Sequence, residues 1–177
     1  MRVLGISGSG KTTLARDLAS RLGVPHLELD SVQHRPGWQE ASDEQWAAAL
    51  EQFVARAPDG WVVDGSYSSR AQDALAAVDT VVWLDLPRRT VMARVARRTA
   101  GRVLLRRELW NGNRESWRNL LRRDPVENIL LWTWTRHGVV RARNAPLWER
   151  HRDGAGGVRW VRLRSPREVR RWLEQTA

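Results

Sequence analysis

An eight-residue segment near the start of the chain constrains the fold more than any other feature. Residues 5–12 read Gly-Ile-Ser-Gly-Ser-Gly-Lys-Thr, a full match to the pattern G-x-x-x-x-G-K-[ST]. Lys11 is the single lysine of the chain, and the other 29 basic residues are arginine. A compact ammonium group on a flexible stem reaches between phosphates where a planar guanidinium does not. The segment therefore predicts a glycine-rich loop whose backbone N–H groups surround phosphate oxygens.

The residues on either side of this loop predict the strand–loop–helix setting that the motif needs. Val3 and Leu4 are apolar before it, and apolar residues recur at helical spacing from Leu14 to Leu22. The N-terminal end of such a helix favours an anion. This context argues against a chance match and predicts a nucleoside triphosphate, ATP, as ligand, with the Thr12 hydroxyl offered to Mg²⁺. The residues expected to bind the nucleotide are Gly5, Ser7, Gly8, Ser9, Gly10, Lys11, Thr12 and Thr13.

Strand patterns alternate with helix patterns along the rest of the chain. Further strands are expected at 26–30, 61–64, 80–86 and 158–163. Helices are expected from Ser42 to about Arg56, from Pro87 onward, at 115–123, from 126 to about 143, and after Ser165. The alternation predicts an α/β fold with a parallel sheet that helices cover on both faces. A length of 177 residues fits one domain over 1–177.

Composition excludes several classes of protein. Without cysteine the chain has neither disulfides nor thiolate metal sites. No apolar run approaches the roughly 18 residues of a membrane span, and no signal peptide precedes the loop, so we expect a soluble, cytoplasmic protein. The net charge of +10 suits either non-specific nucleic-acid binding or attraction of phosphate-bearing substrates. Nucleic acid is the less favoured partner, because no DNA-reading element is recognisable. Most of the 11 tryptophans are expected in the core.

Three aspartates stand at the carboxyl ends of predicted strands, where parallel sheets place ligands. Asp64 is the candidate for holding Mg²⁺ or for accepting a hydrogen bond from Thr12, and its alternative role is to cap the next loop. Asp30 is the candidate for orienting an acceptor hydroxyl and accepting its proton, and it too has capping as its alternative. Asp85 is evenly balanced between capping the helix after Pro87 and belonging to the site.

A stretch at 97–115 is rich in arginine, glycine and asparagine, and within it the helical periodicity is lost. Its composition and its place after the fourth strand are typical of a lid that closes over a nucleotide and excludes water. Arg98 and Arg102 are the first candidates for stabilising charge on a transferring phosphoryl group. The alternative is a solvated basic helix face.

Four segments of the first half of the chain carry a family resemblance. They are residues 5–13, Leu29-Asp30 with the following Pro36-Gly37-Trp38, residues 61–67 and residues 84–87. Together they resemble the adenylate kinase-like P-loop kinases, and among these the small bacterial proteins labelled topology modulation proteins. The resemblance implies the three-layer α/β/α sandwich of P-loop NTPases with a five-stranded parallel sheet and an arginine-rich lid insertion. It also implies binding of ATP and Mg²⁺ and kinase activity on a small acceptor.

The chain departs from true adenylate kinases at the acceptor side. Those enzymes carry Asp-Gly-Phe-Pro-Arg, whereas here Asp64-Gly65 runs into Ser-Tyr-Ser-Ser, and the first arginine is Arg70. The long acceptor-binding helical insert is also missing. Both departures argue against AMP as the acceptor.

These features predict a phosphotransferase that moves the γ-phosphoryl group of ATP to a small acceptor that the sequence does not identify. The expected catalytic residues are Lys11, Asp30, Arg98 and Arg102, with Thr12 and Asp64 at the metal. The alternative, motivated by the basic charge, is a nucleotide-binding regulatory or DNA-associated ATPase with little or no kinase activity. A third possibility is a nucleoside or nucleotide kinase, which differs only in the acceptor and would be marked by a base stacked on Trp38 or Tyr67.

Overall fold

A five-stranded parallel sheet forms the centre of the molecule. The computed structural model describes residues 1–67, 77–105, 108–113, 122, 124–125 and 128–176. The strands are β1 (Arg2–Gly5), β2 (His26–Glu28), β3 (Val62–Asp64), β4 (Thr80–Leu84) and β5 (Arg159–Leu163), in the spatial order β2-β3-β1-β4-β5. All four neighbouring pairs are parallel, so every strand ends at the same edge. The predicted five-stranded parallel sheet is therefore confirmed.

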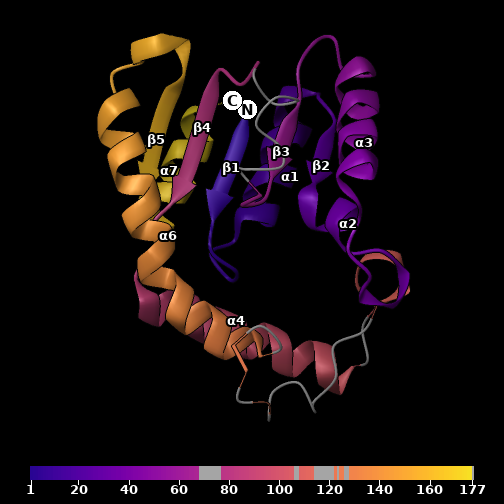
Figure 1. Cartoon of the computed structure of the whole chain (residues 1–177). Helices are drawn as coiled ribbons and strands as arrows, with labels where there is room; N and C mark the ends of the chain where they lie inside the picture. The colour runs from indigo at the N-terminus through magenta and orange to yellow at the C-terminus, as the bar shows by residue number, and fades with distance from the viewer. Residues whose placement is uncertain (68–76, 106–107, 114–121, 123, 126–127, 177) are drawn as a thin grey trace.

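Helices cover both faces of this sheet (Figure 1). Helices α1 (Lys11–Leu22) and α7 (Pro166–Gln175) pack against the face that carries Val3, Val62 and Val82. Helices α3 (Asp43–Ala55) and α6 (Ile129–His151) pack against the opposite face, which carries Leu4, Val63 and Trp83. Successive strand residues point to opposite faces, so each apolar strand contributes to both cores. This is the predicted α/β/α sandwich.

Two helices lie at the carboxyl edge of the sheet rather than on its faces. The short helix α2 (Leu29–Gln33) follows β2 directly, and α4 (Arg88–Leu104) crosses below the sheet in Figure 1. Val91 and Val95 anchor α4 in a third core cluster with Ile6 and Leu86. Short 3₁₀ turns occur at Pro36–Trp38 (η1), Trp110–Gly112 (η2) and Ala155–Gly157 (η3). The carboxyl edge is thus enclosed between the strand ends and α4.

Two of the predicted helix starts, at Ser42 and after Ser165, agree with the structure. Ser42 caps α3 with a complete capping box, in which the Ser42 and Gln45 side chains exchange hydrogen bonds with each other's backbone. Ser165 accepts from the Glu168 N–H at the start of α7. Pro87, expected at the first helical position, is instead the residue just before α4. Local polar residues therefore set these helix starts to within one residue.

Several predicted boundaries are wrong. Strand β2 ends at Glu28, so Asp30 lies on helix α2 and not at a strand end. The predicted fourth strand ends two residues early, at Leu84. Helix α4 continues to Leu104, although the sequence predicted loss of periodicity from Thr99, because arginine has a high helix propensity and one glycine is tolerated.

The last long helix also differs from its prediction. Helix α6 begins at Ile129 and runs to His151 through Pro146, well beyond the predicted end near Arg143. The helix predicted at 115–123 lies outside the described residues, except for Arg122. None of the described helices is both long and apolar enough to cross a membrane.

Candidate active site

The loop between β1 and α1 has the backbone conformation that its glycines predict. Gly10 is the residue before α1 and has φ 95°, in the left-handed region. Gly8 has φ 79°, and a side chain there would overlap Val95 of α4. Glycine is required at both positions because the loop turns sharply while α4 packs directly against it. The amino end of α1 faces the space that the loop encloses.

A cavity of about 1860 Å³ opens between this loop and α4. All eight residues predicted to bind the nucleotide, Lys11 among them, line it, as do the other three predicted catalytic residues, Asp30, Arg98 and Arg102. Asp64 does not line the cavity, since its side chain is fully buried behind Thr12. The fold therefore gathers the predicted residues at one place, with Asp64 beneath the surface.

Thr12 links two carboxylates at the base of the loop. Its hydroxyl lies 3.1 Å from Glu28 Oε1 and 3.0 Å from Asp64 Oδ1, close enough to donate to either. Because the Thr12 hydroxyl has one proton, it donates to only one of the two carboxylates at a time. An oxygen of the other carboxylate can then accept from a different donor or bind a cation. The second oxygen of Asp64 lies 2.8 Å from His26 Nε2. The predicted hydrogen bond between Thr12 and Asp64 is confirmed.

These oxygens have the chemistry that Mg²⁺ prefers. Among the described residues, no three His, Cys, Asp or Glu side chains form a group that would hold a metal by themselves. Mg²⁺ in nucleotide sites needs fewer protein ligands, because substrate phosphates and waters complete its shell. Thr12, Asp64 and Glu28 supply a hydroxyl and two carboxylates at one point, which fits that ion.

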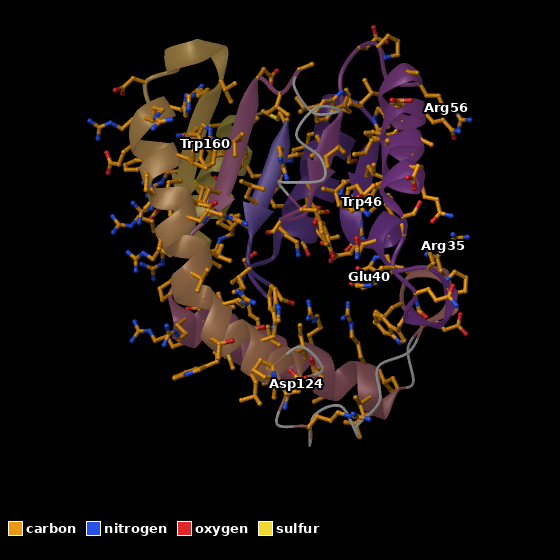
Figure 2. The ribbon with its side chains drawn as sticks, viewed as in Figure 1. Arg35, Glu40, Trp46, Arg56, Asp124 and Trp160 are labelled. Atoms are coloured by element: carbon orange, nitrogen blue, oxygen red, sulfur yellow. The ribbon has the colours of Figure 1, made fainter. Side chains whose placement is uncertain are left out.

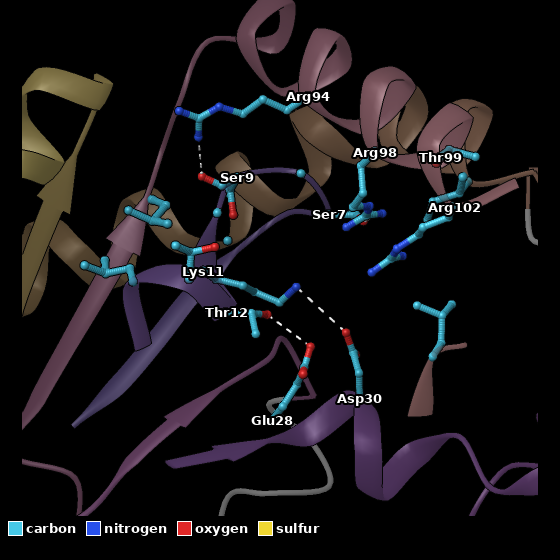
Figure 3. A pocket seen from close by; sticks show the side chains of 18 of the residues that line it. Ser7, Ser9, Lys11, Thr12, Glu28, Asp30, Arg94, Arg98, Thr99 and Arg102 are labelled. Carbon is cyan, nitrogen blue, oxygen red and sulfur yellow. Dashed lines mark hydrogen bonds and ion pairs between the residues drawn. The ribbon is translucent and has the colours of Figure 1, made fainter. Parts of the chain in front are cut away.

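Lys11 and Asp30 face each other across the cavity (Figure 3). Lys11 Nζ lies 3.9 Å from Asp30 Oδ2, and the two side chains are only 12% and 20% exposed. Asp30 Oδ1 accepts a hydrogen bond of 2.8 Å from the Tyr67 hydroxyl. Tyr67 thus fixes one oxygen of Asp30, and the other is directed toward the phosphate loop.

Arginines of α4 reach down to the loop from the opposite wall. Arg98 Nη2 donates to Ser7 Oγ at 2.9 Å, and Arg94 Nη1 donates to the Ser9 carbonyl at 3.0 Å. Arg102 extends into the cavity one helical turn farther along, as Figure 3 shows. The predicted arginines at 97–104 therefore belong to a regular helix that lines the site. Residues 106–107 and 114–115 of the predicted lid lie outside the described part.

Asp85 has neither of the two roles predicted for it, as a helix cap or as a residue of the site. No side chain caps the start of α4, and Asp85 does not line the cavity. Its buried carboxylate instead accepts from Arg162 Nε at 3.0 Å and from Arg162 Nη2 at 2.6 Å. The cap is not made because Arg162 on the neighbouring strand β5 offers two charge-assisted donors.

The tryptophans fall largely where they were expected. Trp46 and Trp83 are fully buried, Trp61 is nearly so, and Trp160 and Trp172 pack against the two sheet cores. Trp38 is an exception, because it is 40% exposed and lines the cavity.

Sequence reasoning missed three residues of the site: Glu28, His26 and Arg94. Glu28 carried a signal, since it is an acidic residue of the expected strand 26–30, two positions before Asp30. Arg94 also carried one, because Arg94, Arg98 and Arg102 follow a four-residue spacing that places them on one helix face. The pairing of His26 with Asp64 joins two strands and depends on the register His26 to Val62, which local pattern does not reveal.

The comparisons with known proteins agree with this architecture. A protein-family model described as an AAA domain matches residues 2–118. No curated protein matches the sequence. A shikimate kinase from Acinetobacter baumannii, solved in complex with shikimate, is 17% identical with a TM-score of 0.55, over 98% of this chain and 88% of that one. A sugar kinase from Janibacter sp. HTCC2649 is 18% identical with a TM-score of 0.52, over 98% and 91%.

A kinase described as putative, from Chloroflexus aurantiacus, is 16% identical with a TM-score of 0.51, over 99% of this chain and 96% of that one. At these identities the likeness concerns the fold alone, which is that of P-loop kinases. The family match covers more than half of the chain and includes the loop, strands β1 to β4 and all of α4. The chain belongs to the AAA domain family.

Proposed function

We propose that this protein is a phosphotransferase that moves the γ-phosphoryl group of ATP to a hydroxyl group of a small acceptor. The observation that carries the proposal is the approach of Lys11 to Asp30 across one cavity, at 3.9 Å. Lysine in this loop is suited to the β- and γ-phosphates, and a carboxylate is suited to an acceptor hydroxyl. The residue that holds the phosphoryl donor and the residue that binds the phosphoryl acceptor thus face the same point of the cavity.

The transfer is a single displacement. The acceptor hydroxyl oxygen forms a bond to the γ-phosphorus while the bond from that phosphorus to the bridging oxygen breaks, releasing ADP. Asp30 orients the hydroxyl and takes its proton, while Tyr67 holds the other carboxylate oxygen. The loop N–H groups and Lys11 hold the β- and γ-phosphates.

Thr12 and Glu28 would hold Mg²⁺, which supplies neutralisation of the phosphate charge when bound, and Asp64 would act on the ion through Thr12. His26 keeps the buried Asp64 carboxylate in place through its 2.8 Å contact. Asp64 therefore orients Thr12 from beneath, and Glu28 faces the cavity.

The arginines of α4 stabilise negative charge on the transferring group. Arg98 and Arg102 are the proposed catalytic pair, and Arg94 fixes α4 to the loop through the Ser9 carbonyl. A lid role for residues 97–115, which would exclude water during transfer, stays a prediction. The narrower likeness to topology modulation proteins, the single-domain organisation and the cytoplasmic location stay predictions.

The test is ATP consumption against a panel of hydroxyl acceptors, with Lys11→Ala and Asp30→Asn assayed beside the unchanged protein. Lys11→Ala should abolish transfer, and Asp30→Asn should lower kcat by about 10²–10⁴-fold, the usual contribution of a general base. Arg56→Ala, an exposed residue at the end of α3, is the control that removes a cation elsewhere. Transfer that survives loss of Lys11 would refute the mechanism.

The regulatory alternative makes a different prediction for the same assay. ATP binding without transfer to any acceptor, together with salt-dependent DNA binding that competes with ATP, would favour a nucleotide-binding regulator. The proposal does not survive that combination.

A further inference from the structure

The cavity has two ends with opposite chemistry. Its volume of about 1860 Å³ exceeds the roughly 300–1,000 Å³ of a typical ligand pocket, so it has room for two molecules. One end is formed by the phosphate loop and the arginines of α4. The side chains at the other end are mostly acidic or aromatic, and they include Asp30, His34, Trp38, Glu40, Tyr67 and Trp110.

Three rings form an aromatic wall at this second end, made of His34, Trp38 and Trp110. His34 stacks on Trp110 with ring centres 5.7 Å apart and an interplanar angle of 30°. Trp38 meets the edge of His34 at 5.4 Å. Trp38 is 40% exposed, although large apolar side chains are usually buried. Because all three residues also line the cavity, the aromatic wall presents ring surface to it.

Hydrogen bonds between two loops hold the aromatic wall in place. Asn113, itself buried, accepts from the Trp38 N–H at 2.9 Å and donates to the Arg35 carbonyl at 2.9 Å. Asn111 donates to the His34 carbonyl at 2.6 Å. Trp38 and Asn111 also both adopt positive φ, at 60° and 56°, which is uncommon for residues other than glycine. A surface fixed at this conformational cost is typical of a binding site.

The charges of the described residues at this end disfavour acidic ligands. The described residues between 28 and 67 that line the cavity include Glu28, Asp30 and Glu40 but no arginine or lysine, and residues 108–110 add Glu108. Figure 2 shows Glu40 facing the opening and Arg35 farther out on the same loop. The cations that line the cavity come instead from α1, α4, α7 and Arg122. A phosphate or carboxylate on the acceptor would meet like charge on this side.

We propose that the acceptor is a ring-shaped hydroxyl compound without a phosphate or carboxylate group, a sugar or an amino sugar. Its ring lies against the aromatic wall, its reacting hydroxyl lies at Asp30, and Glu40 receives a hydroxyl or amine from it. Aromatic faces bind apolar ring surfaces and cations alike, which accommodates both the neutral and the amine-bearing form. This inference rests on the proposed kinase activity.

The first test compares acceptors that share one ring and differ in charge. Glucose, glucosamine, glucuronate and glucose 6-phosphate are assayed, together with parallel sets built on other hexoses and on cyclitols. Lys11-dependent transfer to neutral or amine-bearing members, with acidic members at least tenfold lower in kcat/KM, is the expected result. Lys11-dependent transfer that prefers an acidic acceptor overturns the inference and leaves the kinase proposal standing. No Lys11-dependent transfer to any member also overturns the inference, and the kinase proposal is then decided by the wider panel of hydroxyl acceptors.

The second test removes the aromatic wall. Trp38→Ala should raise the acceptor KM about tenfold, which corresponds to about 1.4 kcal/mol of binding, and should leave the KM for ATP unchanged. Trp134→Ala is the matched control, because Trp134 is 53% exposed on α6 and does not line the cavity. Glu40→Arg should shift the preference toward acidic members of the panel. An acceptor KM that responds equally to the Trp38 and Trp134 substitutions refutes the role of the aromatic wall.

Discussion

The buried ion pair between Asp85 and Arg162 gives the sharpest prediction about stability. Asp85 is 5% exposed and Arg162 is 12% exposed, and two hydrogen bonds of 2.6 and 3.0 Å join them. The Arg162 guanidinium also lies 4.7 Å from the centre of the Trp83 ring. Asp85→Asn keeps the size of the side chain but removes its charge. The substitution therefore leaves a guanidinium buried without its counter-ion.

The expected loss follows from the burial of this pair. Removing one partner of a buried ion pair costs about 3–5 kcal/mol, because the remaining charge is neither solvated nor paired. Arg141 Nε lies 3.5 Å from the same carboxylate, but its side chain is 52% exposed and is re-solvated easily. For a chain of this length, each kcal/mol lowers Tm by about 2–4 °C. Asp85→Asn should therefore lower Tm by about 10 °C.

Thermal and urea unfolding of the unchanged protein and of Asp85→Asn measure the effect. Glu149→Gln is the matched control, because Glu149 pairs with Arg152 at 3.6 Å while the two side chains are 59% and 52% exposed. Exposed pairs contribute about 0–1 kcal/mol, so this variant should unfold almost as the unchanged protein does. Removing both buried charges in Asp85→Asn/Arg162→Met should recover part of the loss. Equal, small losses from Asp85→Asn and Glu149→Gln would show that burial does not govern the pair.

Two further predictions concern residues that the sequence did not single out. His26→Phe leaves one oxygen of the fully buried Asp64 without its 2.8 Å partner, so the free energy of unfolding should fall by about 1–3 kcal/mol and the KM for ATP should rise. His26→Gln, which retains a donor, should recover part of both effects, and no difference between the two variants would contradict the role of the hydrogen bond. Arg2 is buried with two guanidinium nitrogens that lack a partner, and burial, with Arg143 nearby, lowers its pKa to about 10. At about 1.4 kcal/mol for each pKa unit, the buried charge of Arg2 costs about 3 kcal/mol. The unfolded chain binds more protons than the folded one between pH 10 and the ordinary pKa of arginine, so the cost is complete below about pH 10 and is relieved above it. Arg2→Met should therefore raise the urea midpoint at neutral pH, and a lower midpoint would refute this account.

Local sequence patterns predicted most of the fold. The alternation of apolar strands and amphipathic helices was sufficient for the parallel sheet and its two covered faces. The loop at 5–12 was sufficient to locate the cavity, because a segment with this pattern adopts one backbone conformation and that loop forms a wall of the cavity. Capping residues such as Ser42 and Ser165 located helix starts because their side chains act within one turn.

The errors arose where a distant residue decides between two local options. Asp85 has the composition of a helix cap, yet it pairs with Arg162, which is 77 residues away along the chain. Arginine-rich residues 97–104 resembled a lid without periodicity, but the anchoring of Val91 and Val95 in the third core cluster supports a continuous helix. Such contacts depend on tertiary packing, which overrides local propensity.

The end of β2 at Glu28 explains how two carboxylates only two positions apart serve different groups. In a continuing strand, Glu28 and Asp30 would point to the same face of the sheet and compete for one ligand. Leu29 instead begins a helix, and its side chain packs where a side chain on Gly65 would otherwise lie. Glu28 then faces Thr12 at 3.1 Å, and Asp30 faces Lys11 at 3.9 Å. The glycine after β3 therefore separates the proposed metal carboxylate from the proposed acceptor carboxylate, although it touches neither ligand.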